Sequence, residues 1–369
     1  MKTLQEYVSE NRKNTAVTFT DKWWGEMYIG TRAGFYDVPT NSGEKKVFAF
    51  ISYPKAEMPK NGYPAVLLIH GGNGAAFYEM AKVWSERGFV VITPDFNGKY
   101  APSINERQLV NEEGGNVGYG SVADLHDENT WAYFSVLSAM RAIDVLESLD
   151  CVDKNNLFSC GLSWGGFLQL LLSSVEKRIK ASSVIYSSAY VMQSEWGERV
   201  LSSLAEEDKN TWIKYIDPHN YLKNITCPTF FTAGTDDHAF KMENRRITAE
   251  GIIAPTYFGL RKSFPHGNFY GFEQMESSQF FLSFVNGTSI PQPKLTIDNG
   301  FIQATAGQKN STLSLCYTKE DVGAADRQEW EEIPLISGEK TALPTDCTAV
   351  FVSEKTNDGP CFSSNMIIF

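Results

Sequence analysis

Two continuous apolar runs in the first hundred residues predict buried β-strands. The first, AVLLIH, covers residues 65–70 and is followed by a pair of glycines, and the second, FVVITPD, covers residues 89–95. A run that is apolar at nearly every position is typical of a strand covered on both faces, as in a parallel sheet. The residues between them, 75–87, are predicted to form a helix that ends at Gly88. This order of strand, helix and strand indicates an α/β fold.

The same alternation continues to about residue 286. Segment 130–149 places six residues on one helical face, and all but one of them are apolar. These residues are Trp131, Phe134, Ser138, Ala142, Val145 and Leu149. Further strands are predicted over 47–54, 156–161, 181–188, 228–234 and 256–264, and further helices over 167–174, 242–250 and 274–286. We therefore expect a doubly wound, mostly parallel sheet with helices on both of its faces.

The chain divides into three predicted regions. Residues 1–45 are mixed and polar and are expected to be an extension packed on the main domain. The main α/β domain covers 46–290, and a polar and aromatic insert over about 187–226 lies where a cap over the site is expected. After the proline-containing linker NGTSIPQPK, residues 295–369 show short alternating stretches separated by turn residues. That pattern predicts a small antiparallel β-sandwich.

Composition narrows the class of protein. Hydrophobic residues make up 42% of the chain and charged residues 21%, and no apolar run approaches the about 20 residues of a membrane span. The formal net charge of −11 argues against nucleic acid or an anionic membrane as a partner. The amino terminus has no signal-like apolar stretch, so a cytoplasmic protein is expected. The six cysteines contain no CxxC pair, which favours reduced thiols over a metal site, with one bridge among the last three left open.

The motif GLSWGG, residues 161–166, predicts a nucleophilic serine, Ser163. A serine between a strand and a helix needs a very sharp turn, and the residues two before and two after it must be small. Gly161 and Gly165 meet that requirement. The helix that follows directs its first N–H groups toward a developing oxyanion.

A second glycine-rich loop, HGGNG, follows the strand that ends near residue 69. Glycines allow backbone N–H groups to approach a substrate oxygen closely, so the oxyanion hole is predicted to use the N–H of Trp164 and that of Gly72, with Asn73 as the neighbouring candidate. His70 is expected to brace this loop rather than to act as a base.

The remaining members of a triad are expected in the order acid, then histidine, downstream of the serine. His266, in FPHG after a predicted strand, is the candidate base, and Asp236 and Asp237, in GTDDHAF, are both candidates for the acid. Asp237 is favoured because a glycine three residues before the acid is the commoner arrangement at such a turn. His126 and His219, in polar loops, are expected to have no catalytic role.

Together, the segment LLIHGGNGAAFYEMAKVWSERGFVVITPD, Trp131 and the three motifs GLSWGG, GTDDHAF and FPHG resemble the acetylxylan esterase and dienelactone-hydrolase-like branch of bacterial α/β-hydrolases. The resemblance covers about residues 45–285 and extends to the catalytic domains of prolyl oligopeptidase-type peptidases. It implies a carbohydrate or small-ester deacetylase with Ser163, Asp237 and His266 in the triad positions. The final β-module is not general in that branch.

These parts predict a serine carboxylesterase that forms an acyl-enzyme and requires no metal or organic cofactor. Its expected partner is a small-molecule or oligosaccharide ester, and the final module is expected to be structural or to support a homo-oligomer. The residues expected to line the substrate pocket are His238, Trp196, Tyr190 and Trp131. Seven aromatic residues either pack in the core or form a wall against which a sugar ring could stack. These residues are Trp23, Trp24, Trp164, Tyr186, Tyr190, Trp196 and Trp212.

Two other functions remain open at this point. A serine exopeptidase of the prolyl oligopeptidase type is disfavoured, because such enzymes commonly carry a large amino-terminal propeller and only about 45 residues precede the first predicted strand. A noncatalytic binding protein would be expected to have lost members of the triad, whereas each member has a candidate here.

Overall fold

The computed structural model describes most of the chain. The described residues are 2–12, 16–22, 30–40, 43–72, 74–97, 99–101, 109–110, 130–194, 197–198, 201–202, 204–323, 328–356 and 359–369. Of the residues singled out above, Trp23, Trp24, Asn73, His126 and Trp196 lie outside this set.

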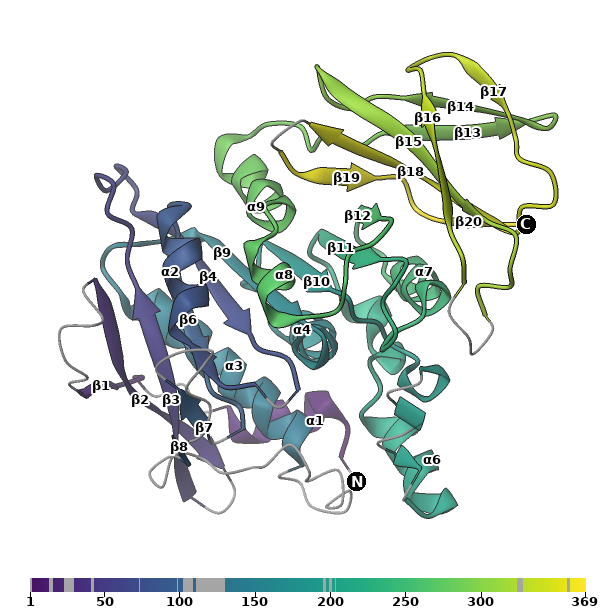
Figure 1. Cartoon of the computed structure of the whole chain (residues 1–369). Coiled ribbons are helices and arrows are strands. Elements are labelled where there is room, and N and C mark those ends of the chain that lie inside the picture. The colour runs from purple at the N-terminus through teal and green to yellow at the C-terminus, as the bar shows by residue number, and fades with distance from the viewer. Residues whose placement is uncertain are drawn as a thin grey trace.

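A long mixed sheet forms the centre of the molecule (Figure 1). Its middle is parallel and has the order β6-β4-β9-β10-β11-β12. These strands are β4 (Tyr63–Ile69), β6 (Val90–Pro94), β9 (Val152–Leu162), β10 (Ala181–Ile185), β11 (Thr229–Gly234) and β12 (Thr256–Arg261). The prediction of a mostly parallel α/β sheet is confirmed.

Alternate residues of the central strands pack into two separate cores. On β4, Leu67 belongs to a cluster with α3 (Trp131–Ser148) and α4 (Trp164–Val175), whereas Leu68 belongs to a cluster with α2 (Tyr78–Glu86) and α9 (Glu276–Asn286). Because successive side chains of a strand point to opposite faces, a strand covered on both sides must be apolar throughout. This explains the continuous apolar runs of the sequence.

The helix predicted over 274–286 is confirmed as α9, and a short helix that was not predicted precedes it. Helix α8 (Asn268–Glu273) ends before Gln274, and α9 begins at Glu276. The Gln274 side-chain oxygen accepts the Ser277 N–H at 3.0 Å, which satisfies one free donor at the start of α9. The predicted insert contains α6 (Glu206–Tyr215) and the short helices η3 (Val191–Gln193), η4 (Pro218–Asn220) and η5 (Leu222–Asn224). Helix α7 (Met242–Gly251) follows β11.

The amino-terminal segment, to which the sequence assigned no element, extends the sheet together with the strand predicted over 47–54, which is confirmed as part of β3. Strands β1 (Phe19–Lys22), β2 (Thr31–Thr40) and β3 (Gly43–Ser52) form an antiparallel edge in which β3 pairs with β6. Helix α1 (Leu4–Asn11) precedes them and packs on α3. It starts with a capping box, in which the Thr3 hydroxyl accepts the Glu6 N–H and the Glu6 carboxylate accepts the Thr3 N–H. A T-x-x-E spacing is a sequence signature of a helix start and could have marked α1.

The carboxyl-terminal residues form an antiparallel β-module, as predicted. A three-stranded sheet contains β13 (Lys294–Asp298), β14 (Phe301–Thr305) and β17 (Lys340–Ala342). It packs on β15 (Ser311–Thr318), β16 (Glu331–Leu335), β18 (Ala349–Thr356) and β20 (Ile367–Ile368). Strand β19 (Cys361–Ser363) pairs with β18.

This module is joined to the main sheet rather than only tethered by a linker. Strand β19 pairs antiparallel with β12, so the central sheet continues through β19 and β18 to β15 and β16 (Figure 1). Phe351 of β18 also belongs to the same buried cluster as α3 and α4.

A separate small sheet contains β5 (Ala76–Phe77), β7 (Lys99–Ala101) and β8 (Leu109–Val110). The six cysteines are free thiols. Within the described part of the chain, no helix is both long enough and apolar enough to cross a membrane.

Candidate active site

Ser163 lies in the sharp turn between β9 and α4. Its backbone has φ 53° and ψ −122°, a conformation that a residue with a side chain rarely adopts. The strand β9 holds the turn from one side, and the Ser163 N–H donates to the Ile185 carbonyl of β10 at 2.9 Å from the other. The strained backbone directs the side chain above the carboxyl end of the sheet.

Two glycines make this turn sterically accessible. A Cβ on Gly161 would overlap the carbonyl oxygen of Gly165, and a Cβ on Gly165 would overlap the carbonyl oxygens of Ile69 and His70 at the end of β4. The spacing of glycines that the sequence showed is therefore required by backbone contacts within the turn and with the neighbouring strand.

A chain of hydrogen bonds joins three side chains from three different loops. Ser163 Oγ lies 2.8 Å from His266 Nε2, and His266 Nδ1 lies 2.9 Å from Asp237 Oδ1. An ionised carboxylate only accepts, so Nδ1 carries the proton and Nε2 is free to accept from the serine hydroxyl. This arrangement can take a proton from Ser163 and hold the resulting imidazolium beside a carboxylate.

The structure distinguishes the two adjacent aspartates by their contacts. Asp237 is fully buried at its side chain, accepts from His266, and also accepts the Ala239 N–H at 2.9 Å. The Asp236 side chain lies beside Gly234 instead, where an added Cβ would come 2.6 Å from its Oδ1.

Arg245 of α7 forms a buried ion pair with Asp237, and the sequence analysis did not identify it. Its guanidinium donates to Asp237 Oδ2, the oxygen not used by His266, and the arginine side chain is 3% exposed. Burial would raise the pKa of Asp237, but the charge of Arg245 and the hydrogen bond from His266 outweigh it and lower that pKa. Arg245 follows Asp237 by eight residues in the chain, and no sequence motif marks the pair.

Aromatic residues surround the His266 ring. The Tyr186 ring lies 4.5 Å from it between centroids, and the Tyr186 hydroxyl donates to the Gly267 carbonyl. The Phe240 ring lies nearly parallel to it at 6.3 Å between centroids, and the exposed His238 ring lies 5.7 Å away. Tyr186 therefore buttresses the histidine loop from the core rather than lining an open wall.

His70 holds the glycine loop beside the serine. Its Nε2 accepts the Phe96 N–H at 3.0 Å, so Nδ1 carries the proton and donates to the Gly71 carbonyl at 2.8 Å. Burial lowers the pKa of His70 to about 4, so the ring is neutral in the folded protein near pH 7. A Cβ on Gly71 would come 3.2 Å from Ser163 Cβ, which shows how closely this loop approaches the turn at Ser163.

The other residues expected at the pocket have different positions. Trp131 is 3% exposed and stacks on Trp164 at 5.2 Å, so both indoles belong to the core. Tyr190 is half-buried and stacks on His219 at 5.2 Å. Gly72 lies in the described loop after β4, next to Gly71. Among the described residues, no group of three or more His, Cys, Asp or Glu side chains is placed to hold a metal ion.

A known protein family includes the part of the chain that forms this site. The model of the dienelactone hydrolase family matches residues 49–266, more than half of the chain. The chain belongs to the dienelactone hydrolase family. The match extends from β3 to His266 and so includes all three loops that meet at Ser163. The resemblance inferred from the sequence motifs is confirmed at the level of the family.

Relatives of this hydrolase include both esterases and peptidases. It is 24% identical over 222 residues to the acetyl esterase Axe7A of Xylanibacter ruminicola, an alignment that covers 57% of this chain and 50% of that one. It is 25% identical over 130 residues to dipeptidyl-peptidase 5 of Aspergillus oryzae, covering 33% of this chain and 16% of the peptidase. The chain thus spans half or less of the length of these relatives.

Solved structures share the fold of this dienelactone hydrolase family member. The acetyl xylan esterase of Paenibacillus sp. R4 superposes with a TM-score of 0.58 at 15% identity, covering 78% of this chain and 92% of that one. Acetyl xylan esterase 1 of Thermoanaerobacterium gives 0.56 at 17% identity, covering 76% and 92%. The predicted α/β-hydrolase fold is therefore confirmed.

Replacing Arg245 with methionine should move the acid limb of the pH profile of kcat/KM to higher pH. Asp237 stays buried but loses its cation, so its pKa rises and it becomes protonated at a higher pH. Breaking this buried pair should also cost about 3–5 kcal/mol of stability. Arg245→Lys should recover part of the shift, because it restores the charge. The adjacent Arg246→Met is the matched control, since Arg246 pairs with the half-exposed Glu250. An unshifted limb in Arg245→Met would show that the ion pair does not act on Asp237.

His70 should make the folded state less stable in mild acid. The unfolded imidazole has a pKa of about 6.5 and the folded one about 4, so between these values the unfolded chain binds a proton that the folded protein does not. The contribution is fully present above about pH 6.5 and falls by about 3 kcal/mol by about pH 4. Denaturant unfolding at several pH values should show this loss in the wild type. His70→Gln can make both hydrogen bonds without titrating, so it should lack this loss of stability. Equal pH dependence of the unfolding free energy in the two proteins would rule out the contribution of His70.

Proposed function

We propose that this protein is a serine carboxylesterase that removes small acyl groups, acetyl above all, from a carbohydrate or similar alcohol. The observation that carries the proposal is the hydrogen-bonded chain from Ser163 through His266 to Asp237 at the carboxyl ends of β9, β12 and β11. Ligands of open α/β sheets bind at this edge. The acetyl esterase and acetyl xylan esterases among the similar proteins support the choice of substrate.

In the first half of the reaction, Ser163 attacks the ester carbonyl. His266 Nε2 takes the hydroxyl proton as the bond from Oγ to the carbonyl carbon forms, and Asp237 stabilises the imidazolium through Nδ1. The tetrahedral intermediate collapses by breaking the bond from carbon to the alcohol oxygen, which takes the proton from Nε2. The products of this half are the free alcohol and an acyl group on Ser163.

In the second half of the reaction, a water molecule attacks the acyl group by the same steps as the serine did. His266 takes a proton from water as the hydroxide oxygen bonds to the acyl carbon, and the collapse returns that proton to Ser163 Oγ. The N–H groups of Trp164 and of the loop at Gly72 and Asn73 are proposed to hold the oxyanion in both halves. The approach of Gly71 to Ser163 supports this assignment, because it brings the loop against the nucleophile.

A serine peptidase is the second candidate, and the partial similarity to dipeptidyl-peptidase 5 is the observation that favours it. Peptidases and esterases share the same acyl-enzyme chemistry and differ in the leaving group and in how the chain on either side of the bond is held. The distinction therefore requires a comparison of substrates.

A panel of p-nitrophenyl acetate, longer p-nitrophenyl esters, acetylated xylo-oligosaccharides and aminoacyl p-nitroanilides separates the two functions. We expect the highest kcat/KM on the acetyl esters, and a loss of at least about 10³-fold in Ser163→Ala, since the nucleophile is absent. Ser187→Ala, which removes a buried hydroxyl near Gly166, serves as a control that keeps the nucleophile. Faster cleavage of the anilides than of the esters would replace the esterase proposal with the peptidase. Full activity in Ser163→Ala would contradict both.

A further inference from the structure

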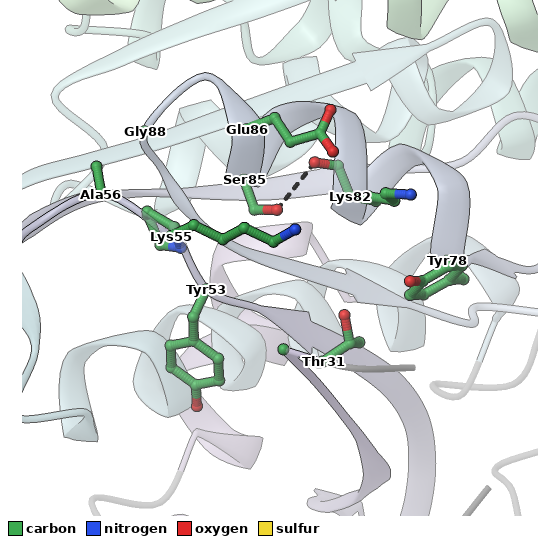
Figure 2. Close-up of a pocket in the computed structure, with 11 residues that line it drawn as sticks. Thr31, Tyr53, Lys55, Ala56, Tyr78, Lys82, Ser85, Glu86 and Gly88 are labelled. Carbon is green, nitrogen blue, oxygen red and sulfur yellow. Dashed lines mark hydrogen bonds between the residues drawn. The ribbon is translucent and has the colours of Figure 1, made fainter. Parts of the chain in front are cut away.

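Two of the cavities among the described residues lie outside the hydrogen-bonded triad. One of about 440 Å³ lies along α2 and is lined from the segment after β3, which includes Ala56, and from the helix itself (Figure 2). Because Ser52, the last residue of β3, pairs with Val91 near the start of β6, this segment lies at the amino ends of the parallel strands. That is the edge of the sheet opposite to Ser163.

The other cavity is a groove of about 510 Å³ between the histidine loop and the β-module. One wall is residues 261–265, which lead directly into His266, together with Tyr270 of α8. The Tyr270 ring lies against Gly267, where an added Cβ would be 3.2 Å from its Cδ2. The groove therefore adjoins the loop that carries the catalytic histidine.

The opposite wall comes from the β-module, whose strands have two different faces. Leu313 of β15 and Val352 of β18 point into the cluster shared with the small sheet. Their neighbours Ser314 and Ser353 form a cross-strand pair and line the groove. Since side chains alternate along a strand, one face stabilises the module and the other is presented to the histidine loop.

The lining of the groove is polar but close to neutral. Arg261 is neutralised by the buried Glu276, which also accepts the Cys361 N–H at 2.6 Å. The remaining charged residues are two lysines and two glutamates, Lys262, Lys355, Glu273 and Glu332.

Hydroxyl groups and one exposed aromatic ring complete this surface. Ser263, Thr312 and Ser314 supply the hydroxyls, since Ser353 is buried and paired with Cys361, and Tyr270, which is 54% exposed, supplies the ring. A balanced set of donors and acceptors beside an exposed aromatic ring matches a neutral polyhydroxy ligand, which offers hydroxyls and an apolar C–H face. An anion or a charged peptide terminus would require an excess of one sign.

We propose that this groove is a binding site for a neutral oligosaccharide, which holds the sugar chain whose ester is presented to Ser163. The inference rests on the proposed esterase function and assigns a role to the β-module, which builds one wall of the groove. Tyr270 stacks on a sugar ring, and the hydroxyls of Thr312 and Ser314 on β15 bind along the chain.

Substrates with and without a sugar chain test the site. We expect Tyr270→Ala and the groove-filling Ser314→Trp each to lower kcat/KM for an acetylated xylo-oligosaccharide about tenfold more than for p-nitrophenyl acetate. Ala56→Trp places the same indole in the α2 cavity and should leave the ratio of the two unchanged. An unchanged ratio in both groove variants would overturn the proposal.

A binding measurement separates this inference from the proposed function. Unacetylated xylohexaose, titrated by calorimetry into the wild type, should bind, and its Kd should rise about tenfold in Tyr270→Ala and in Ser314→Trp but not in Ala56→Trp. Binding that behaves in this way supports the groove even if acetyl esters are not hydrolysed. Turnover of p-nitrophenyl acetate without any binding of xylohexaose to the wild type would overturn the groove while the esterase stands.

Discussion

The close contact between the turn at Ser163 and the end of β4 is the constraint on which the rest of the site depends. Neither Gly161 nor Gly165 can carry a side chain there, and Ser163 itself adopts a backbone conformation that is strained for a residue with a Cβ. The strain persists because β9 is held in the sheet between β4 and β10. The glycine loop after β4 is thereby brought against Ser163.

Next to that turn, the position and charge of Asp237 depend on its electrostatic partners. The buried Asp237 carboxylate accepts hydrogen bonds from two side chains. His266 donates to one oxygen and Arg245 to the other. A buried carboxylate without a cation would tend to take up a proton and lose its hold on the imidazole. The ion pair with α7 keeps Asp237 ionised, so a helix outside the three loops contributes to the state of the proposed triad.

Much of this architecture was predictable because it depends on local patterns. Strands such as β4 and β6 are apolar throughout since both faces are covered, and GLSWGG can be recognised because the turn tolerates only small residues at fixed positions. The pairing of Asp237 with Arg245 was not predictable, because a contact between a loop and the following helix depends on how α7 packs.

The strands and pairings at the two edges of the sheet were also not predictable from the sequence. Strand β2 alternates too weakly to stand out, with four consecutive buried residues, and the pairing of β19 with β12 joins residues about a hundred positions apart. That pairing makes the β-module a continuation of the sheet, and it positions β15 and β18 beside the histidine loop. A linker composition near residue 290 indicates a boundary in the chain but not where the next strands will pack.

The most direct test of the central claim is covalent labelling of the nucleophile. A fluorophosphonate probe, followed by proteolysis and mass spectrometry, should modify the peptide that contains Ser163, and the label should be absent from Ser163→Ala. Prior incubation with a slowly hydrolysed ester should protect the same peptide, since the acyl group and the probe compete for one oxygen. Stoichiometric labelling of a different residue, or ester hydrolysis by the wild type with no labelling of Ser163, would contradict the account.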